Sequence, residues 1–170
     1  MVESNETLLN AKSTVLFKET WHKGVIGIVA ARCVEKFYRP TVILTESNDK
    51  ITGSARSVKD FDLYEALHKC SDLLEKFGGH KYAAGLTLDR SKLLSFQERF
   101  EEVVSASITE EMRTPVISID VPIQFDLMTS KFNEVLKQMA PFGPDNPKPV
   151  FEARHVFVMN SLSSFKEKHL

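Results

Sequence analysis

Apolar and polar residues follow one another along the chain in periods that predict alternating strands and helices. Short β-branched or apolar runs predict four strands, at 14–17, 41–45, 51–57 and 83–88. Longer stretches with apolar residues at helical spacing predict three helices, at 26–37, 63–77 and 91–107. Strands that alternate with helices indicate an α/β domain, in which helices flank a mixed β-sheet.

The second predicted helix has a beginning and an end that the sequence marks. Asp62 and Glu65 resemble a capping box, with Asp in place of Ser or Thr. The glycine pair Gly78-Gly79 follows the last apolar position of the pattern, and glycine commonly ends a helix. We therefore expect the chain to leave the helix at these two glycines.

The last third of the chain has a different pattern. Apolar and polar residues alternate over 117–125, which predicts a half-buried strand, and Pro122 indicates a place at a sheet edge. A short helix is predicted over 132–139. Four of the seven prolines fall within 141–149, which indicates a rigid connector. The run 150–159 then predicts a final strand with no visible partner.

Two polar segments interrupt these elements. Residues 1–12 contain no apolar stretch of the kind found in signal peptides, so we expect a disordered or linker segment there. Residues 110–114 are expected to form a polar link between a helix and the alternating run that follows.

Charge and cysteine content narrow the range of partners. The chain has 22 basic and 23 acidic residues, so a basic field over the whole surface is excluded, although a local basic site is not. Cys33 and Cys70 fall on apolar helix faces, which predicts buried free thiols. No apolar run approaches the roughly 20 residues that span a bilayer. We expect a cytoplasmic protein without membrane contact.

His80 is the first candidate for chemistry. It follows Gly78 and Gly79, and three of the seven glycines lie within 77–85. Glycines clear the approach to a histidine and can form an anion-binding turn, to which His80 adds a hydrogen-bond donor. The alternative is structural, because the small residues at 83–85 would also allow tight packing against a helix.

Arg56 is the second candidate, flanked by Ser54 and Ser57. A guanidinium offers a fork suited to phosphate, and the two hydroxyls would add donors. The alternative is a solvated arginine in a surface turn. This stretch and the glycine–histidine stretch bracket one predicted helix, so their ends could meet at one edge of the sheet.

The stretch 21–27 lies between a strand and a helix N-terminus, a position suited to an anion. It lacks the spacing of a phosphate loop or a dinucleotide fingerprint. Trp21 either packs in the core, which we favour, or stacks on a base. Candidate DNA contacts are Trp21, His22 and Lys81.

The sequence contains no recognisable pattern of metal ligands. None of the five histidines forms a pattern such as HExxH, no CxxC occurs, and no aspartate cluster suggests a two-metal site. We expect no metal site in this chain. The residues alone predict an α/β domain that binds a phosphate-sized anion and has no evident means of cleaving it.

Several stretches, taken together, resemble a known family. The runs WHKGVIGIVAARCVEKFYRPTVIL, GSARS and FGGHKYAAGLTL resemble the DHH-associated domain of the DHH phosphoesterase family. The run MAPFGPDNPKPVF resembles the passage into an OB-fold domain in one branch of it, the RecJ family of bacterial single-strand-specific exonucleases. The resemblance covers about residues 13–157.

The resemblance implies a 5′-to-3′ exonuclease of single-stranded DNA that serves repair and recombination. It implies four parts, which are a disordered or linker segment at 1–12, a DHH-associated substrate-binding domain at 13–110, a connecting strand and helix at 111–145, and the truncated start of an OB-fold domain at 146–170. The residues that it assigns to the substrate phosphate are Ser54, Arg56, Ser57, Gly78, Gly79 and His80. Among these, His80 faces the scissile phosphate and is expected to be catalytic.

The resemblance also implies a division of labour. In that family the N-terminal DHH domain holds Mn²⁺ or Mg²⁺, and this chain has no Asp-His-His motif. Its expected partners are single-stranded DNA and the DHH domain of the same polypeptide, and we expect the chain to be inactive alone. Two alternatives stay open, an accessory domain of an oligoribonucleotide or cyclic-dinucleotide phosphodiesterase and a non-catalytic nucleic-acid-binding module. The proline-rich run favours the exonuclease, because the smaller phosphodiesterases have no reason to continue into an OB-fold.

Overall fold

The computed structural model describes residues 2–3 and 5–157, which belong to two compact units. The N-terminal unit spans Met1–Pro115 and the C-terminal unit spans Val116–Leu170. Each unit is described by itself. Within the described residues, no helix has both the length and the apolar character needed to cross a membrane.

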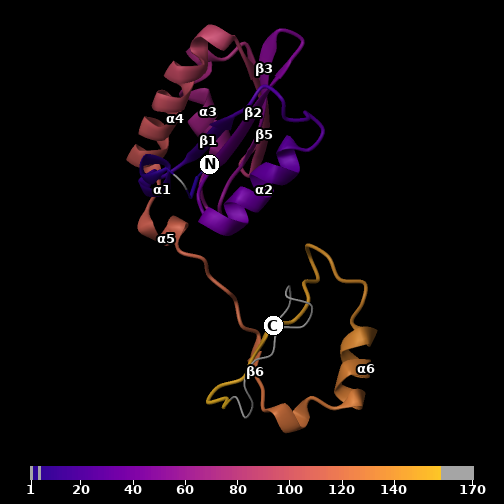
Figure 1. Ribbon diagram of the computed structural model, residues 1–170. Helices are drawn as coiled ribbons and strands as arrows, with labels where there is room; N and C mark the ends of the chain where they lie inside the picture. The colour runs from indigo at the N-terminus through magenta and orange to yellow at the C-terminus, as the bar shows by residue number, and fades with distance from the viewer. Residues whose placement is uncertain (1, 4, 158–170) are drawn as a thin grey trace. The chain divides into compact units, whose positions relative to one another are not determined.

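A five-stranded mixed sheet forms the centre of the N-terminal unit (Figure 1). Its strands are β1 Thr14–Phe17, β2 Thr41–Ser47, β3 Lys50–Arg56, β4 Lys76–His80 and β5 Ala83–Leu88, in the order β1-β2-β3-β5-β4. The β1–β2 pair is parallel, and the other pairs are antiparallel. The predicted mixed sheet is therefore confirmed.

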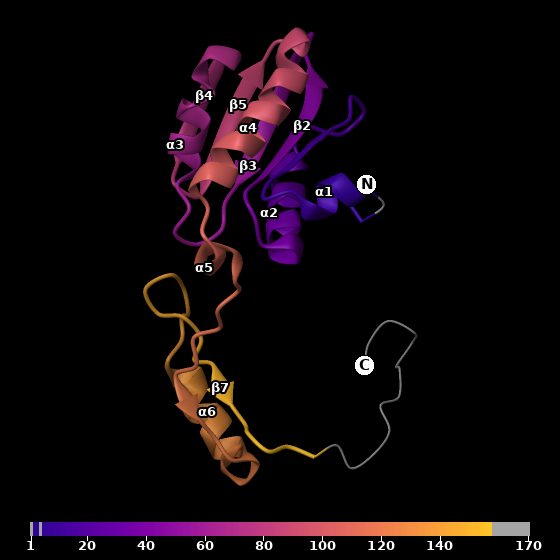
Figure 2. The same cartoon turned by 90° about the vertical axis from the view of Figure 1, so that its left-hand side faces the viewer.

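Helices cover the two faces of this sheet (Figures 1 and 2). Helix α2 (Ile26–Phe37) packs on one face, and α3 (Leu63–His68) and α4 (Leu93–Ser107) pack on the other. Successive residues of β2 point to opposite faces, so Ile43 joins Ile26 in the smaller core under α2. Leu44 joins Phe96 in the larger core under α3 and α4.

The predicted helix over 63–77 is wrong in its second half. Asp62 does cap α3, with its Oδ1 accepting from the Glu65 N–H at 3.0 Å. However, α3 ends at His68, a 3-10 turn η1 follows at Ser71–Leu73, and β4 then pairs with β5. Phe77 belongs to the strand and packs on α3, with its ring 5.5 Å from the Tyr64 ring. Phe77 is apolar because it packs on a helix from a strand, and its position happened to match the helical spacing of the residues before it.

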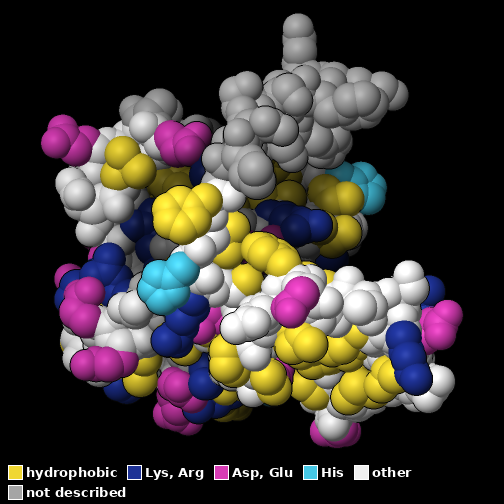
Figure 3. Space-filling model, turned by 90° about the horizontal axis from the view of Figure 1, so that it is seen from below, with side chains coloured by type: hydrophobic (Ala, Val, Ile, Leu, Met, Phe, Trp, Pro, Cys, Tyr) yellow, Lys and Arg dark blue, Asp and Glu magenta, His cyan; other side chains and the backbone are white. Residues whose placement is uncertain are grey.

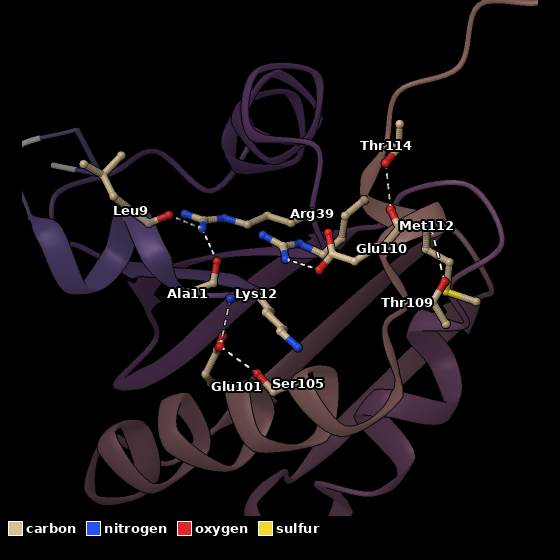
Figure 4. Close-up of polar contacts among 11 residues, drawn as sticks. Leu9, Ala11, Lys12, Arg39, Glu101, Ser105, Thr109, Glu110, Met112 and Thr114 are labelled. Atoms are coloured by element: carbon tan, nitrogen blue, oxygen red, sulfur yellow. Dashed lines mark hydrogen bonds and ion pairs between the residues drawn. The ribbon is translucent and has the colours of Figure 1, made fainter.

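The N-terminal segment, which we expected to be disordered or a linker, contains helix α1 (Glu6–Asn10). Arg39 is only 3% exposed, and its side chain donates to the carbonyls of Leu9 and Ala11 (Figure 4). It also donates to the Leu8 carbonyl. The Glu101 carboxylate accepts from the backbone N–H of Lys12 at 2.8 Å. These contacts hold the segment against the domain, and the polar composition gave no sign of them.

Two smaller expectations in this unit have definite outcomes. Residues 110–114, expected to be a polar link, contain the short helix α5 (Glu110–Arg113). The two cysteines are free thiols as predicted; Cys70 is buried and Cys33 is half-buried. Burial raises the pKa of the Cys70 thiol to about 11.

The C-terminal unit contains a short parallel pair, β6 (Val121–Pro122) with β7 (Phe151–Glu152), and helix α6 (Ser130–Gln138). The helix was predicted. The half-buried strand predicted over 117–125 is wrong. Ile117 is 76% exposed, and of the alternating apolar residues only Ile123 is buried. Of the final strand predicted over 150–159, only Phe151–Glu152 forms a strand, which does have a partner, β6. Residues 153–157 are not a strand, and positions 158 and 159 lie outside the described residues.

Candidate nucleic-acid interface

Part of one sheet face carries almost no side-chain bulk. Helix α2 packs there on β2 and β3. Farther along the same face, β5 presents Ala83 and Gly85, and β4 presents Gly78. A Cβ atom built on Gly78 would meet no atom within 4 Å. We call the surface formed by β3, β5 and β4 on this side the bare sheet face.

Arg56 and His80 lie at the same end of the bare sheet face. Arg56 pairs with Ala83 in the β3–β5 ladder, and Ala83 pairs with His80 in the β5–β4 ladder. Directly opposed residues in antiparallel strands project to the same side. Two strand spacings place the Cα atoms of Arg56 and His80 about 10 Å apart. The register thus brings together two stretches that are far apart in the sequence.

The Arg56 guanidinium is held on one side only. Its Nη1 donates to the Ser54 Oγ at 3.0 Å and to the Ala55 carbonyl at 2.8 Å. Within the described part of the chain it forms no ion pair, whereas Arg32 and Arg90 each pair with a carboxylate. Its charge is therefore not neutralised by a neighbouring acid, and donors remain for a bound anion.

The His80 imidazole has a defined tautomer in its neutral form. Its Nδ1 accepts from the Tyr82 backbone N–H at 3.3 Å, so the proton is assigned to Nε2. The β4–β5 turn that carries it is fixed by two backbone hydrogen bonds. Ser57 N–H donates to the Tyr82 carbonyl at 3.1 Å, and Leu63 N–H donates to the Lys81 carbonyl at 3.0 Å. His80 is thus an exposed donor on an anchored hairpin.

The two glycines before His80 have different structural requirements, and neither ends a helix as we had predicted. Gly79 has a φ of 149°, and a Cβ there would lie 2.3 Å from the Ala83 carbonyl oxygen. Only glycine fits that position. Gly78 faces open space and has no such restriction.

The remaining predicted site residues are more distant from this arrangement or already engaged. Ser57 donates its hydroxyl proton to the Phe61 carbonyl at 3.1 Å, which closes a loop. Lys81 is exposed on the hairpin turn, with its Nζ 5.6 Å from the centre of the Tyr82 ring. Trp21 is half-buried against the smaller core, as favoured, and His22 is exposed on the loop before α2.

The stretch 21–27 was considered for an anion as a whole, and the structure places its last residue, Gly27, beside Arg56. Gly27 is the second residue of α2, and it lines a groove of about 460 Å³ together with Gly24, Ile28 and Arg56. The sequence feature that could have pointed to Gly27 itself is a glycine within the first turn of a predicted helix. Ala83 was noted only as a small residue, and the structure places it between Arg56 and His80.

Charge over the surface of the chain is balanced. Basic and acidic side chains are interspersed on the face drawn in Figure 3, in line with the net charge of −1. Among residues 2–3 and 5–157, no group of three or more His, Cys, Asp or Glu side chains is arranged to hold a metal ion.

Two family models together match most of the chain. A family model described as the DHHA1 domain matches residues 10–106, and one described as the RecJ OB domain matches residues 119–170. The second match begins within the part that we expected to be a connecting strand and helix.

Individual relatives match over most of the chain. It is 37% identical over 156 residues to the single-stranded-DNA-specific exonuclease RecJ of Bacillus subtilis, which covers 91% of this chain and 19% of that protein. The crystal structure of RecJ in complex with Mn²⁺ from Thermus thermophilus matches with a TM-score of 0.71 and 32% identity, over 84% of this chain and 21% of that one. The Mg²⁺ complex matches with a TM-score of 0.69 and 34% identity, over 83% and 22%. The chain thus spans about a fifth of the length of these relatives.

Proposed function

Because this chain belongs to the DHHA1 domain family, in the form found in RecJ exonucleases, we propose that it is the substrate-binding half of a 5′-to-3′ exonuclease of single-stranded DNA. The complete enzyme would hydrolyse phosphodiester bonds during DNA repair and recombination in the cytoplasm. This half would bind the phosphate at the DNA end and would be inactive alone.

One observation carries the proposal. Arg56, which pairs with no acid among the described residues, shares one end of the bare sheet face with His80. A phosphate approaching this face would meet a bidentate cation and a histidine N–H, with no bulky side chain between them. The small residues of β5 and β4 would let a polynucleotide backbone lie close to the sheet.

Each residue has a defined part in the proposal. Arg56 binds phosphate oxygens, and Ser54, already bonded to it, orients the guanidinium. His80 donates from Nε2 to a phosphate oxygen of the scissile group. Gly79 shapes the hairpin, and Gly78 leaves the approach open. Ser57 is left out, because its hydroxyl proton is already donated to Phe61.

The described residues do not fit a metal ion, since they include no group of ligands for one. The proposal assigns Mn²⁺ or Mg²⁺ to the DHH domain of the same polypeptide, where the metal would supply hydroxide and stabilise leaving charge. Two of the matched RecJ structures are described as complexes with these ions. This half contributes positioning and charge-assisted contacts instead.

Two alternatives are less well supported. An oligoribonucleotide or cyclic-dinucleotide phosphodiesterase would share the DHHA1 domain, but the match of residues 119–170 to the RecJ OB domain favours the exonuclease. A non-catalytic nucleic-acid-binding module would bind single strands without regard to the chemistry of the end. That difference makes the two classes separable in a binding experiment.

The test is a titration of the chain into fluorescently labelled single-stranded DNA, with and without a 5′-phosphate, at low salt. We expect weak binding that is tighter for the phosphorylated end, and we expect Arg56→Ala and His80→Ala to remove the difference. Arg99→Ala, on α4 across the sheet, is the charge-matched control. Equal binding of both ends by the unmodified chain would contradict the proposal. A second assay with Mn²⁺ present should release no nucleotides, and release would contradict the inactivity of this half.

A further inference from the structure

Helix α2 approaches the sheet through a glycine at one particular point. A Cβ built on Gly27 would lie 3.1 Å from both Arg56 Nη2 and Ser54 Oγ, and 3.8 Å from Arg56 Cζ. These contacts would be tighter than side chains normally accept. The absence of a side chain at position 27 therefore sets where the guanidinium and the hydroxyl can lie.

The atoms crowded by such a Cβ are the ends of side chains, not backbone. This separates Gly27 from Gly79, whose Cβ would meet the Ala83 carbonyl at 2.3 Å. An alanine at 27 leaves the helix free to form, since alanine has the higher helix propensity. What must move is the Arg56 guanidinium or the Ser54 hydroxyl. A glycine in a helix costs stability, and here the cost has an identifiable purpose.

The position of the crowded atom matters for the chemistry. Arg56 Nη1 already donates to Ser54 and Ala55, while Nε and Nη2 have no hydrogen bond within the described residues. Those two nitrogens form the side-on fork that binds two oxygens of one phosphate. Nη2, one half of that fork, is the atom beside Gly27.

We infer that Gly27 is a positioning residue for the DNA-end site. It keeps the Nε/Nη2 edge of Arg56 in place by allowing the guanidinium to lie between β3 and the first turn of α2. This inference rests on the proposed function, because the phosphate is the ligand that the fork would bind. Gly27 itself contributes no group to the phosphate.

The experiment compares the unmodified chain, Gly27→Ala and Gly143→Ala. The last is the matched control, since a Cβ at Gly143 would meet nothing within 4 Å. Three quantities are measured: the ratio of affinities for phosphorylated and unphosphorylated DNA ends, the Arg56 Nε–H signal in NMR spectra without DNA, and the unfolding temperature. Gly27→Ala should lower the affinity ratio about tenfold, as for loss of a charge-assisted hydrogen bond. It should shift the Arg56 signal and leave the unfolding temperature equal or higher, while Gly143→Ala changes neither the ratio nor the signal.

The outcomes separate failure of this inference from failure of the proposed function. An unchanged Arg56 signal in Gly27→Ala overturns the inference, whatever the DNA result. A shifted signal with an unchanged affinity ratio also overturns it, because the guanidinium position would then not govern end recognition. If the unmodified chain shows no preference for the phosphate, the proposed function fails, and the NMR signal alone decides whether Gly27 positions Arg56. A lowered unfolding temperature in Gly27→Ala would make Gly27 a packing residue and overturn the inference as well.

Discussion

Arg56 and His80 occupy one row of the sheet, on the same face, with only the methyl group of Ala83 between them. They come from strands that are adjacent to a common neighbour, β5, and not to each other. Their Cα separation of about 10 Å is within the combined reach of an arginine and a histidine side chain acting on one bound phosphate. The two residues are therefore expected to act as a unit.

The first prediction follows from that geometry. Arg56→Ala and His80→Ala should each weaken binding of 5′-phosphorylated DNA, and the double variant should lose less than the sum of the two. We expect a coupling free energy of at least about 0.5 kcal/mol, as found for residues that share a ligand or network. Fluorescence anisotropy on the four proteins of the cycle gives this value directly.

The same cycle with Arg99 in place of Arg56 supplies the control. Arg99 lies on α4 and pairs with Glu102 and Asp72, away from the bare sheet face. The loss of binding free energy in Arg99→Ala should simply add to the loss in His80→Ala, without a coupling free energy. Additive losses in the Arg56–His80 cycle would mean that the two residues serve separate sites.

Sequence patterns predicted best the elements whose apolar residues follow one simple pattern from end to end. Helix α2 has apolar residues at helical spacing, and strands β1, β2 and β5 are short apolar or β-branched runs, so pattern and fold agree. Strand β4 is no such run, because it contains two glycines and contributes mainly Phe77 to the core. Phe77 lies at helical spacing from Leu74 only by coincidence. The hydrogen bonds to β5, which are not local in sequence, decide the outcome.

The candidate site shows the same limit. Arg56, Ser54 and His80 could be named from residue type and from the resemblance to a family, because guanidinium, hydroxyl and imidazole are suited to phosphate. Their arrangement in one row depends on the β3–β5–β4 register, which no local pattern specifies. Gly27 lies in the stretch 21–27 that we considered for an anion, but its contact with Arg56 could not be predicted, because the two residues are 29 positions apart.

The second prediction concerns the two glycines of β4. Gly79→Ala should destabilise the chain by about 2–4 kcal/mol, because a φ of 149° and a backbone oxygen 2.3 Å from the new Cβ exclude a side chain. Gly78→Ala should leave stability equal or raise it by up to about 1 kcal/mol, since alanine costs less backbone entropy and meets no atom. Urea unfolding of both variants measures the difference. Similar losses for the two would refute the distinction.

The third prediction is a pH dependence at the end of β5. The Asp89 carboxylate accepts from the Ser91 N–H at 2.9 Å, the Ser91 hydroxyl at 2.8 Å and the Lys50 ammonium at 3.2 Å. These bonds lower its pKa to about 2. Because the folded pKa lies below the unfolded value of about 3.9, the stabilisation is complete above pH 4 and is lost as the pH falls toward 2.

An NMR titration of the Asp89 carboxyl carbon checks this value. Ser91→Ala removes the hydroxyl donor and keeps the backbone donor, so the pKa should rise only part of the way. Lys50→Met should also raise the pKa, because it removes both a hydrogen bond and the attraction of the ammonium group. A midpoint near 4 in the unmodified chain would contradict the geometry.

The fourth prediction concerns Arg39, whose side chain is buried at the junction of α1 and the sheet. Its Nε donates to Thr14 Oγ1 at 2.7 Å, and its other donors meet carbonyls at the end of α1 (Figure 4). Arg39→Met removes the donors and leaves the partly buried carbonyls of α1 and the buried Thr14 hydroxyl without these partners, so we expect a loss of about 2–4 kcal/mol. Arg32→Met, which breaks only an exposed pair with Glu35, should change stability by less than about 1 kcal/mol.

Arg39→Met should loosen helix α1 locally, in addition to lowering the global stability of the chain. Helix α1 has five residues, far too few to be stable without tertiary contacts. Its backbone amides, and that of Ala11, should therefore exchange with solvent faster in Arg39→Met, while those of β2 and β3 change only with the global stability. Hydrogen exchange followed by NMR separates the two effects. Unchanged protection of α1 would mean that the Glu101 contacts with Lys12 and Ser13 hold the segment without Arg39.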